Sequence, residues 1–302
     1  MGDAEGPAAS AGWSAHEREY SPSTCIPSID VELAQYAERS RAAATLPHRS
    51  LAYGDRADER LVVFDGPAGA PLHVFVHGGY WQALSAEDSL LPAPELVGAG
   101  HTFAAVDYTL APHATIGTMI DQCVRALECV VADLRPSAIT LSGSSAGAHL
   151  AAHVAQRTTA AIDRLILLSG MFQLEPLRAT TVNDALGLDA AHAEAWSVPL
   201  SPRPACQVVI VHGRIETVAF KAQSARLAAA WGVPAVEVDD RNHFDLVHDL
   251  AAIDLRLGPP DRDAGDGSTN AGHEVALVAA AERPGAPRRL APDLLHPTAT
   301  SS

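Results

Sequence analysis

Short apolar runs recur along this chain, and most are followed by a turn and a helical stretch. Continuous runs rich in Val and Ile are typical of strands that are buried on both faces of a parallel sheet. The first two predicted strands are short and come before this repeat begins. The predicted strands lie near Ser50–Tyr53, Leu61–Phe64, Leu72–Val76, Thr102–Val106, Ile139–Leu141, Leu165–Leu168, Val208–Val211 and Ala235–Val238.

Segments with helical periodicity separate the later runs. They are predicted at residues 28–45, with Ser28 or Asp30 as the N-terminal cap, and at Ile116–Leu134, Ala146–Gln156, Thr217–Trp231 and Asp245–Leu257. Strands that alternate with helices indicate an α/β fold with a doubly wound, mostly parallel sheet and helices on both faces.

Three segments fall outside this alternation. Residues 1–17 are rich in Gly, Ala and Ser and are predicted to be a flexible N-terminus, whereas 18–257 form the α/β domain. Residues 171–204 interrupt the repeat and are predicted as a small cap insertion over a pocket, with a plain surface excursion of two short helices as the alternative. Residues 258–302 break all periodicity and are predicted to be a mostly disordered tail.

Charge and composition exclude several classes of protein. The chain has 36 acidic and 21 basic residues with a single lysine, Lys221, which disfavours nucleic-acid binding. No run of 18 apolar residues predicts a membrane span, and the first 20 residues do not read as a secretory signal. The four cysteines form no C-x-x-C pair, so we expect buried thiols in a reducing cytoplasm.

The pentapeptide Gly143–Gly147 reads G-S-S-A-G and lies between a predicted strand and a predicted helix. This G-x-S-x-G pattern is typical of the nucleophile elbow of α/β-hydrolases, in which a sharp turn exposes the middle serine. Ser145 is therefore the candidate nucleophile. The flanking glycines are expected because a Cβ would clash with the neighbouring strand and helix. Ordinary helix capping by Ser144 is the alternative explanation of the pattern.

A serine nucleophile needs a base and an orienting acid, which in this topology follow it in the order acid, then histidine. Glu216 follows the strand predicted at Val208–Val211, and His243 follows the strand predicted at Ala235–Val238. Both positions lie at carboxyl ends of strands, where catalytic groups gather in α/β sheets. Three rival acids stay open, namely Asp239, Asp240 and Asp245.

An oxyanion hole needs two preorganised backbone N–H donors. One is expected from Ala146, directly after the candidate nucleophile. The other is expected from Gly78 and Gly79, in the loop His77–Trp81 that follows a predicted strand. A tight turn that merely needs two glycines is the alternative.

The histidines and cysteines predict neither a metal site nor a cofactor. His149 and His153 are four residues apart on the predicted elbow helix, which is a metal-ligand spacing, but the sequence offers no third ligand beside them.

Taken together, these motifs resemble the arylformamidase (kynurenine formamidase) branch of the α/β-hydrolase family. The resemblance covers about residues 18–256 and is not confined to the elbow. The segments that carry it are Glu19–Ser23, Tyr53–Asp55, His77–Trp81, Asp107–Pro112, Ser145–Leu150, Phe220–Ser224 and His243–Asp245.

The resemblance implies a catalytic triad of Ser145, Glu216 and His243. The sequence departs from the family pattern at three places. Ser144 stands where the family often has His, Glu216 stands where many members have Asp, and Thr217–Ala219 replaces a common Pro-Glu. Glutamate is one methylene longer than aspartate, so the loop is expected to retract to keep the contact with His243.

The expected activity is hydrolysis of an N-formyl arylamine, such as N-formylkynurenine or a related formamide of tryptophan catabolism, to the arylamine and formate. Tyr80, Trp81 and Trp196 are candidates for a flat apolar slot for the aryl group, with core packing as the alternative. The partner is thus a small aromatic molecule, and a homodimer stays open. The alternative functions are a small-ester or thioester carboxylesterase on the same triad, and a non-catalytic binding protein.

Overall fold

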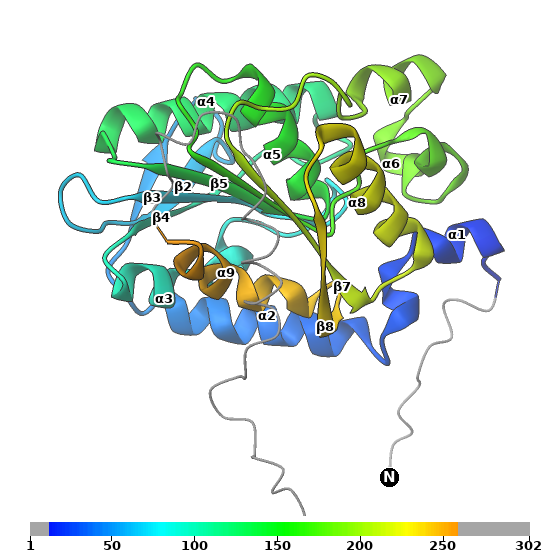
Figure 1. The fold of residues 1–302 in the computed structure, drawn as a ribbon, viewed down its shortest axis with the longest axis horizontal. Helices are drawn as coiled ribbons and strands as arrows, with labels where there is room; N and C mark the ends of the chain where they lie inside the picture. The colour runs from blue at the N-terminus through cyan, green and yellow to red at the C-terminus, as the bar shows by residue number, and fades with distance from the viewer. Residues whose placement is uncertain (1–11, 259–302) are drawn as a thin grey trace, which may run out of the picture.

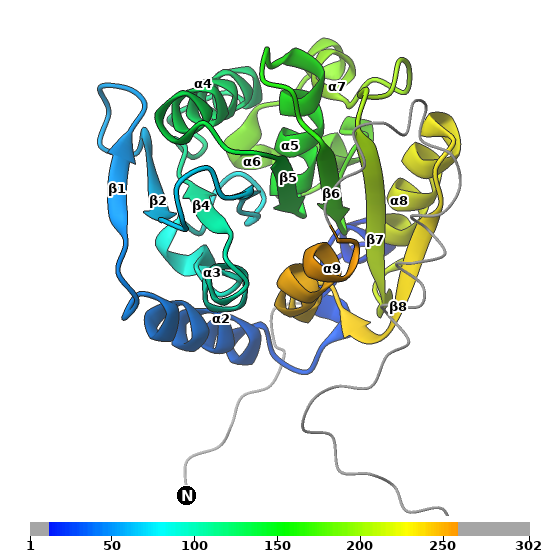
Figure 2. The same ribbon diagram turned by 60° about the vertical axis from the view of Figure 1, so that its left-hand side comes forward.

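The computed structural model describes residues 12–258, and the predicted tail 258–302 lies outside them except for Gly258. Eight strands form one sheet with the order β1-β2-β4-β3-β5-β6-β7-β8 (Figures 1 and 2). All eight predicted strands are present. Their bounds are Arg49–Ala52 (β1), Arg60–Phe64 (β2), Leu72–Val76 (β3), Thr102–Val106 (β4), Ile139–Ser144 (β5), Arg164–Leu168 (β6), Gln207–Ile215 (β7) and Ala235–Asn242 (β8).

The sheet is parallel from β4 to β8, and β2 pairs antiparallel with both β1 and β4. Parallel neighbours require crossover helices, and these cover both faces. Figure 1 shows α4 (Ile116–Leu134), α5 (Ala146–Arg157) and α8 (Val218–Trp231) on one face, and α2 (Ile29–Ala43), α3 (Ala93–Gly98) and α9 (Leu250–Arg256) on the other. The predicted doubly wound architecture is confirmed.

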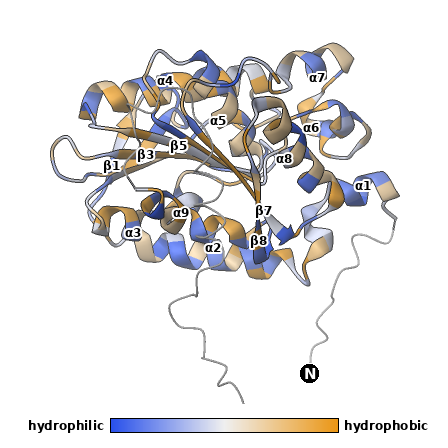
Figure 3. Cartoon of the chain, in the orientation of Figure 1, coloured by the Kyte–Doolittle hydropathy of each residue, from blue (hydrophilic) through white to orange (hydrophobic). Residues whose placement is uncertain are grey.

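Alternate residues of the central strands feed two separate apolar cores. Along β7, Val208 and Ile210 join the core under α4, α5 and α8, whereas Val209 and Val211 join the core under α2, α3 and α9. This division explains why the sequence of these strands is apolar at successive positions, because both faces are covered by helices. Figure 3 shows the apolar strands between helices whose outer faces are more polar.

The helix that follows β8 differs from its prediction. The segment expected as one helix from 245 to 257 divides into a 3₁₀ turn, η5 (Asp245–Asp249), and the short helix α9. The structure also adds α3 and the 3₁₀ turn η3 (Glu87–Ser89), which periodicity did not predict. Such short segments carry too few apolar positions to show a helical period.

The insertion after β6 contains the 3₁₀ turn η4 (Glu175–Ala179) and the short helices α6 (Asn183–Leu186) and α7 (Ala190–Trp196). It forms a small cap at the end of the sheet where α8 begins (Figure 1). At the N-terminus, α1 (Ala15–Glu19) and the 3₁₀ turn η2 (Pro22–Cys25) are regular structure, so order begins ahead of the boundary predicted at residue 18.

The cysteines are less buried than expected. Cys123 lies fully buried on α4, but Cys25, Cys129 and Cys206 are partly exposed. Among the described residues, no helix combines the length and hydropathy needed to cross a membrane.

A buried ionic network attaches α9 to the sheet. Asp254 of α9 receives hydrogen bonds from Arg164 (2.6 Å) and Thr140 (3.1 Å), and its other oxygen lies 2.7 Å from His73 Nδ1. His73 Nε2 lies 2.6 Å from the Ser142 hydroxyl. This Ser–His–Asp chain lies inside the protein, with His73 and Ser142 0% exposed, so it has no access to substrate and serves the fold.

The network also sets the ionisation of Asp254. Burial alone raises the pKa of this carboxyl group, but His73 and Arg164 outweigh it and hold the pKa well below its usual range. Because folding lowers this pKa, the carboxylate stabilises the fold fully above its unfolded-state pKa, and this contribution is lost as the pH falls.

We therefore expect Asp254→Asn to lower the free energy of unfolding by about 3 kcal/mol at neutral pH, because it breaks a buried ion pair. The difference from the unsubstituted protein should shrink as the pH is lowered. Urea unfolding followed by circular dichroism measures both effects. Asp65→Asn is the control: Asp65 is 46% exposed in its pair with Arg49, so its loss should cost less than about 1 kcal/mol. Equal losses for the two variants would contradict the assignment.

Candidate active site

Ser145 stands at the junction of β5 and α5, in the turn predicted from the sequence. Its φ and ψ of 56° and −120° lie in a region that residues with side chains rarely adopt. The Ser145 N–H donates to the Leu168 carbonyl at the end of β6, at 2.8 Å. This contact fixes the strained turn against the neighbouring strand.

The two glycines of the motif allow the turn to pack closely. A Cβ added to Gly143 would lie 2.2 Å from the Gly147 carbonyl oxygen, and one added to Gly147 would lie 2.0 Å from the Val76 carbonyl oxygen. Both obstacles are backbone atoms that cannot move away independently. The expected reason for the two glycines is therefore confirmed, and α5 rests directly on the end of β3.

Glu216 follows β7 and is buried, with 7% of its surface exposed. One carboxylate oxygen, Oε1, accepts hydrogen bonds from the Ser169 hydroxyl and the Gly213 N–H, both at 2.6 Å. The other oxygen, Oε2, lies 3.2 Å from His243 Nδ1. The carboxylate thus bends back toward Gly213, three residues before it in the chain.

His243 follows β8 and is 5% exposed. Because its Nδ1 faces Glu216, Nε2 is the nitrogen left to exchange a proton with a serine hydroxyl. The ring lies edge-on to Phe220 of α8, with 4.5 Å between the ring centroids. Phe220 is fully buried, so it restricts the rotation of the imidazole.

Two of the three rival acids make other contacts, and the third is exposed. Asp239 is exposed and pairs with Arg214 at 2.5 Å, and Asp240 is exposed too. Asp245 accepts from the Asn242 N–H at 2.7 Å and pairs with Arg241 at 3.5 Å. Glu216 is the acid in hydrogen-bonding distance of the imidazole of His243.

Burial alone raises the pKa of Glu216, but its hydrogen-bond partners outweigh this effect. The hydrogen bond and charge of His243, followed by Ser169 and Gly213, bring the pKa of Glu216 below its ordinary value. The carboxylate therefore stays ionised at neutral pH and can stabilise an imidazolium at His243.

The loop after β3 lies directly against the elbow. A Cβ added to Gly78 would lie 3.2 Å from the Ser145 Cβ and 2.9 Å from the Ser144 carbonyl oxygen. Gly79 has a φ of +92°. Ala146 is the first residue of α5, where an N–H group has no acceptor within the helix. The three residues predicted to donate to an oxyanion, Gly78, Gly79 and Ala146, are therefore grouped around the elbow.

Tyr108 contacts His77, the first residue of this loop. The Tyr108 hydroxyl donates to the His77 carbonyl at 3.0 Å, and the two rings stack with 4.3 Å between centroids. Tyr108 lies just after β4, in the segment Asp107–Pro112 that resembles the family. The sequence predicted no role for it. The loop is thus fixed by the adjacent strand, as a preorganised oxyanion hole requires.

The N-terminal segment Ala15–Cys25 binds the elements around the elbow. Tyr80 donates its hydroxyl to the Tyr20 carbonyl, and Thr217, next to Glu216, donates its hydroxyl to the Glu19 carbonyl at 2.7 Å. Glu17 accepts from the hydroxyl of Thr181 in the cap at 2.6 Å. This segment therefore connects the loop that carries Gly78 and Gly79, the loop that carries Glu216, and the cap.

Of the three predicted substrate-binding aromatic residues, only Tyr80 lies beside the catalytic candidates. Its ring is 6.5 Å from that of Phe220, which contacts His243. Trp81 is 0% exposed and lies edge-on to His149, so it packs in the core. Trp196 is the last residue of α7 and is partly exposed, and its ring packs against Arg157 of α5, with 5.3 Å between the guanidinium carbon and the ring centroid.

His149 and His153 attach the cap to the elbow helix. Their Nε2 atoms lie 2.6 and 3.0 Å from the carbonyl oxygen of Trp196 at the end of α7. Burial lowers the pKa of both, that of His153 to about 4, so both rings are neutral donors. Their four-residue spacing is thereby explained by a shared acceptor, and within residues 12–258 no cluster of three His, Cys, Asp or Glu side chains could hold a metal ion.

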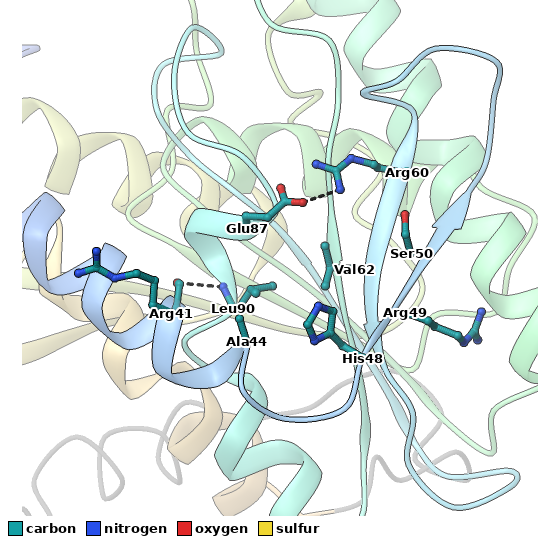
Figure 4. Close-up of a pocket in the computed structure, with 10 residues that line it drawn as sticks. Arg41, Ala44, His48, Arg49, Ser50, Arg60, Val62, Glu87 and Leu90 are labelled. Atoms are coloured by element: carbon teal, nitrogen blue, oxygen red, sulfur yellow. Dashed lines mark hydrogen bonds and ion pairs between the residues drawn. The ribbon is translucent and has the colours of Figure 1, made fainter.

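A surface pocket of about 410 Å³ lies away from these residues, between α2, η3 and the antiparallel edge of the sheet (Figure 4). Two of its three arginines are paired, Arg60 with Glu87 at 2.5 Å and Arg49 with Asp65 at 2.8 Å, and Arg41 is exposed at its rim. We assign this pocket no role.

Sequence reasoning missed Ser169 and Phe220 as neighbours of the acid and the base. A serine after β6 carries no motif, and Phe220 was noted only as part of a family segment. Ser169 directly follows β6, and Phe220 lies in the first turn of α8, after β7; these positions were the available signal.

Comparisons with known proteins agree with this architecture. A family model described as alpha/beta hydrolase fold matches residues 73–210. A candidate thioesterase from Silicibacter sp. is 27% identical, with a TM-score of 0.74 over 83% of this chain and 97% of that structure. A carboxylesterase from a metagenomic library, 19% identical with a TM-score of 0.59 over 78% of this chain and 98% of that structure, shares the fold. The protein is thus an α/β-hydrolase, with the predicted cap insertion.

Two curated relatives narrow the family. The kynurenine formamidase of Salmo salar is 30% identical over 273 residues, which are 80% of this chain and 92% of that protein. The kynurenine formamidase of Danio rerio is 29% identical over 264 residues, 78% of this chain and 90% of that protein. The chain belongs to the arylformamidase (kynurenine formamidase) branch of the α/β-hydrolase family. It is a hydrolase.

The packing of α5 on β3 generates a test. Gly147→Ala places a methyl group against the Val76 carbonyl and should destabilise the protein by about 2–3 kcal/mol, with loss of activity. Gly98→Ala at the end of α3 meets no atom within 4 Å and should be neutral or slightly stabilising. Thermal unfolding of both variants makes the comparison. A Gly147→Ala protein as stable and active as the Gly98→Ala protein would refute the close contact.

Proposed function

We propose that this hydrolase removes the formyl group from an N-formyl arylamine, with N-formylkynurenine as the leading example. The observation that carries the proposal is the hydrogen bond between His243 and Glu216, at the edge of the sheet where Ser145 follows β5. The kynurenine formamidases of Salmo salar and Danio rerio support the choice of a formamide.

In the proposed mechanism, Ser145 Oγ attacks the formyl carbon while His243 Nε2 takes the hydroxyl proton. The carbonyl oxygen becomes an oxyanion that accepts hydrogen bonds from the N–H groups of Ala146 and of Gly78 or Gly79. Glu216 stabilises the imidazolium of His243 and fixes the orientation of its ring.

His243 then gives its proton to the amide nitrogen, the C–N bond breaks, and the arylamine leaves with a formyl ester on Ser145. An arylamine is a better leaving group than an alkylamine because its lone pair is delocalised into the ring. His243 next takes a proton from water, whose oxygen attacks the formyl ester. Return of that proton to Ser145 Oγ releases formate.

The aryl group needs an apolar surface beside the scissile bond. We assign this role to Tyr80, whose ring lies next to Phe220 and whose hydroxyl is held by Tyr20. The proposal does not use Trp81 and Trp196, which the sequence also suggested, because Trp81 is buried in the core and Trp196 packs against Arg157 of α5.

A second candidate function is hydrolysis of a small ester or thioester by the same residues. The solved structure described as a candidate thioesterase supports it. A substrate panel decides between the two: N-formylkynurenine, N-formylanthranilate and p-nitrophenyl esters are compared by kcat/KM. Higher values for the formamides support the first proposal, and turnover of esters alone supports the second.

Ser145→Ala should lower kcat by about 10⁴-fold or more, because it removes the nucleophile. Labelling by a fluorophosphonate should be lost in the same variant. The measurement is made on protein whose folded state is verified by circular dichroism. A folded variant that retains more than a tenth of the activity would reject Ser145.

Glu216→Gln should be nearly as damaging, since an amide leaves the imidazolium without a counter-charge. Asp239→Asn is the matched control: it removes the charge of a rival acid that is exposed and paired with Arg214, and it should leave kcat within about twofold. The reverse order of severity in steady-state kinetics would move the acid to Asp239.

A further inference from the structure

Ser169 places a buried hydroxyl between the nucleophile and the acid. It directly follows β6, the strand between β5, which leads to Ser145, and β7, which leads to Glu216. The residue is 0% exposed, and its Oγ donates to Glu216 Oε1 at 2.6 Å.

The backbone at this point is bound on both sides. The Leu168 carbonyl accepts the N–H of Ser145, and the N–H of Ser169 donates to the Val211 carbonyl, each at 2.8 Å. Ser169 itself has a φ of +48°, a conformation that side chains other than those of Asn and Asp seldom adopt. A strained backbone conformation persists only where the surrounding structure holds it in place. Here this conformation points the Ser169 hydroxyl toward Glu216.

We propose that Ser169 is a positioning residue for the acid, which fixes the Glu216 carboxylate so that Oε2 faces His243 Nδ1. The proposal rests on the assignment of Glu216 in the proposed function. It gives two adjacent residues at the carboxyl end of β6 different tasks: the Leu168 carbonyl binds the elbow, and Ser169 binds the acid.

A glutamate needs such a constraint more than an aspartate does, because it has one more rotatable bond. Two donors, Ser169 Oγ and Gly213 N, hold Oε1 from different strands. Gly213 lies near the end of β7, only three residues before Glu216 in the same chain segment. Ser169 is the donor that ties the carboxylate to the strand that also holds Ser145.

Among the described residues, His243 contacts this carboxylate from the turn after β8, and the thiol of Cys25 in η2 interacts with it electrostatically. The charges of Glu19 and Lys221 act on the same thiol. Burial, together with the charge of Glu216, raises the pKa of the Cys25 thiol, so it stays neutral in the acidic range. Changes in the acid limb of a pH profile therefore report on the pair of His243 and Glu216.

The test compares Ser169→Ala with Ser169→Gly. Both remove the hydroxyl, but glycine adopts a positive φ without strain, so the pair separates the hydrogen bond from the backbone conformation. The readouts are kcat/KM and the rate of fluorophosphonate labelling of Ser145 over a series of pH values. Circular dichroism and thermal unfolding verify the fold, and Ser169→Gly decides the question if Ser169→Ala does not fold.

We expect both variants to lose about tenfold or more in labelling rate and kcat, because a hydrogen bond to a charged group is lost. KM should change little. The acid limb should move to higher pH in both, since Ser169 lowers the pKa of Glu216 and its removal makes the pair more basic.

Two results would overturn the proposal. One is a full labelling rate with an unshifted acid limb in a folded variant. The other is a loss in Ser169→Ala that Ser169→Gly restores, which would assign the effect to the backbone. Fluorophosphonate labelling needs an activated Ser145 but no particular substrate. If the substrate panel shows that formamides are not hydrolysed, the labelling rate therefore still tests the role of Ser169.

Discussion

The close packing of α5 against the end of β3 is the constraint on which the site depends. At Gly147 the helix approaches the Val76 carbonyl so closely that no side chain fits between them. This approach places the first N–H groups of α5 beside the loop that carries Gly78, with Ser145 between them. A single contact between backbone atoms therefore positions both the candidate nucleophile and the expected oxyanion donors, and no flexible side chain takes part in it.

The remaining groups reach this point through the order of the strands. Neighbouring parallel strands end at the same edge, so β5, β6 and β7 deliver Ser145, Ser169 and Glu216 side by side, and β8 delivers His243. The loops are then connected by the N-terminal segment, which binds both Tyr80 and Thr217. Residues nearly two hundred positions apart in the sequence thus fix the same site.

Much of the fold was predictable because the strands are buried on both faces, which leaves apolar runs such as Leu72–Val76 in the sequence. Glu216 and His243 were predictable from their places after such runs. The contacts of Ser169 and Phe220 were not predictable, because contacts between segments that are distant in the chain leave no pattern in the neighbouring sequence. The two tryptophans were predicted as part of a binding slot, but Trp81 is buried in the core, and the partly exposed Trp196 packs against Arg157 of α5 and Gly117 of α4.

The use of glutamate at position 216 follows from the shape of the loop that carries it. β7 continues to Ile215 with a register shift after Gly213, where a Cβ would lie 2.4 Å from the Arg241 carbonyl oxygen. The carboxylate folds back over this bulge to the Gly213 N–H and the Ser169 hydroxyl. A shorter aspartate starting from the same Cα would have to give up either these donors or His243, so the longer acid and the bulged strand belong together.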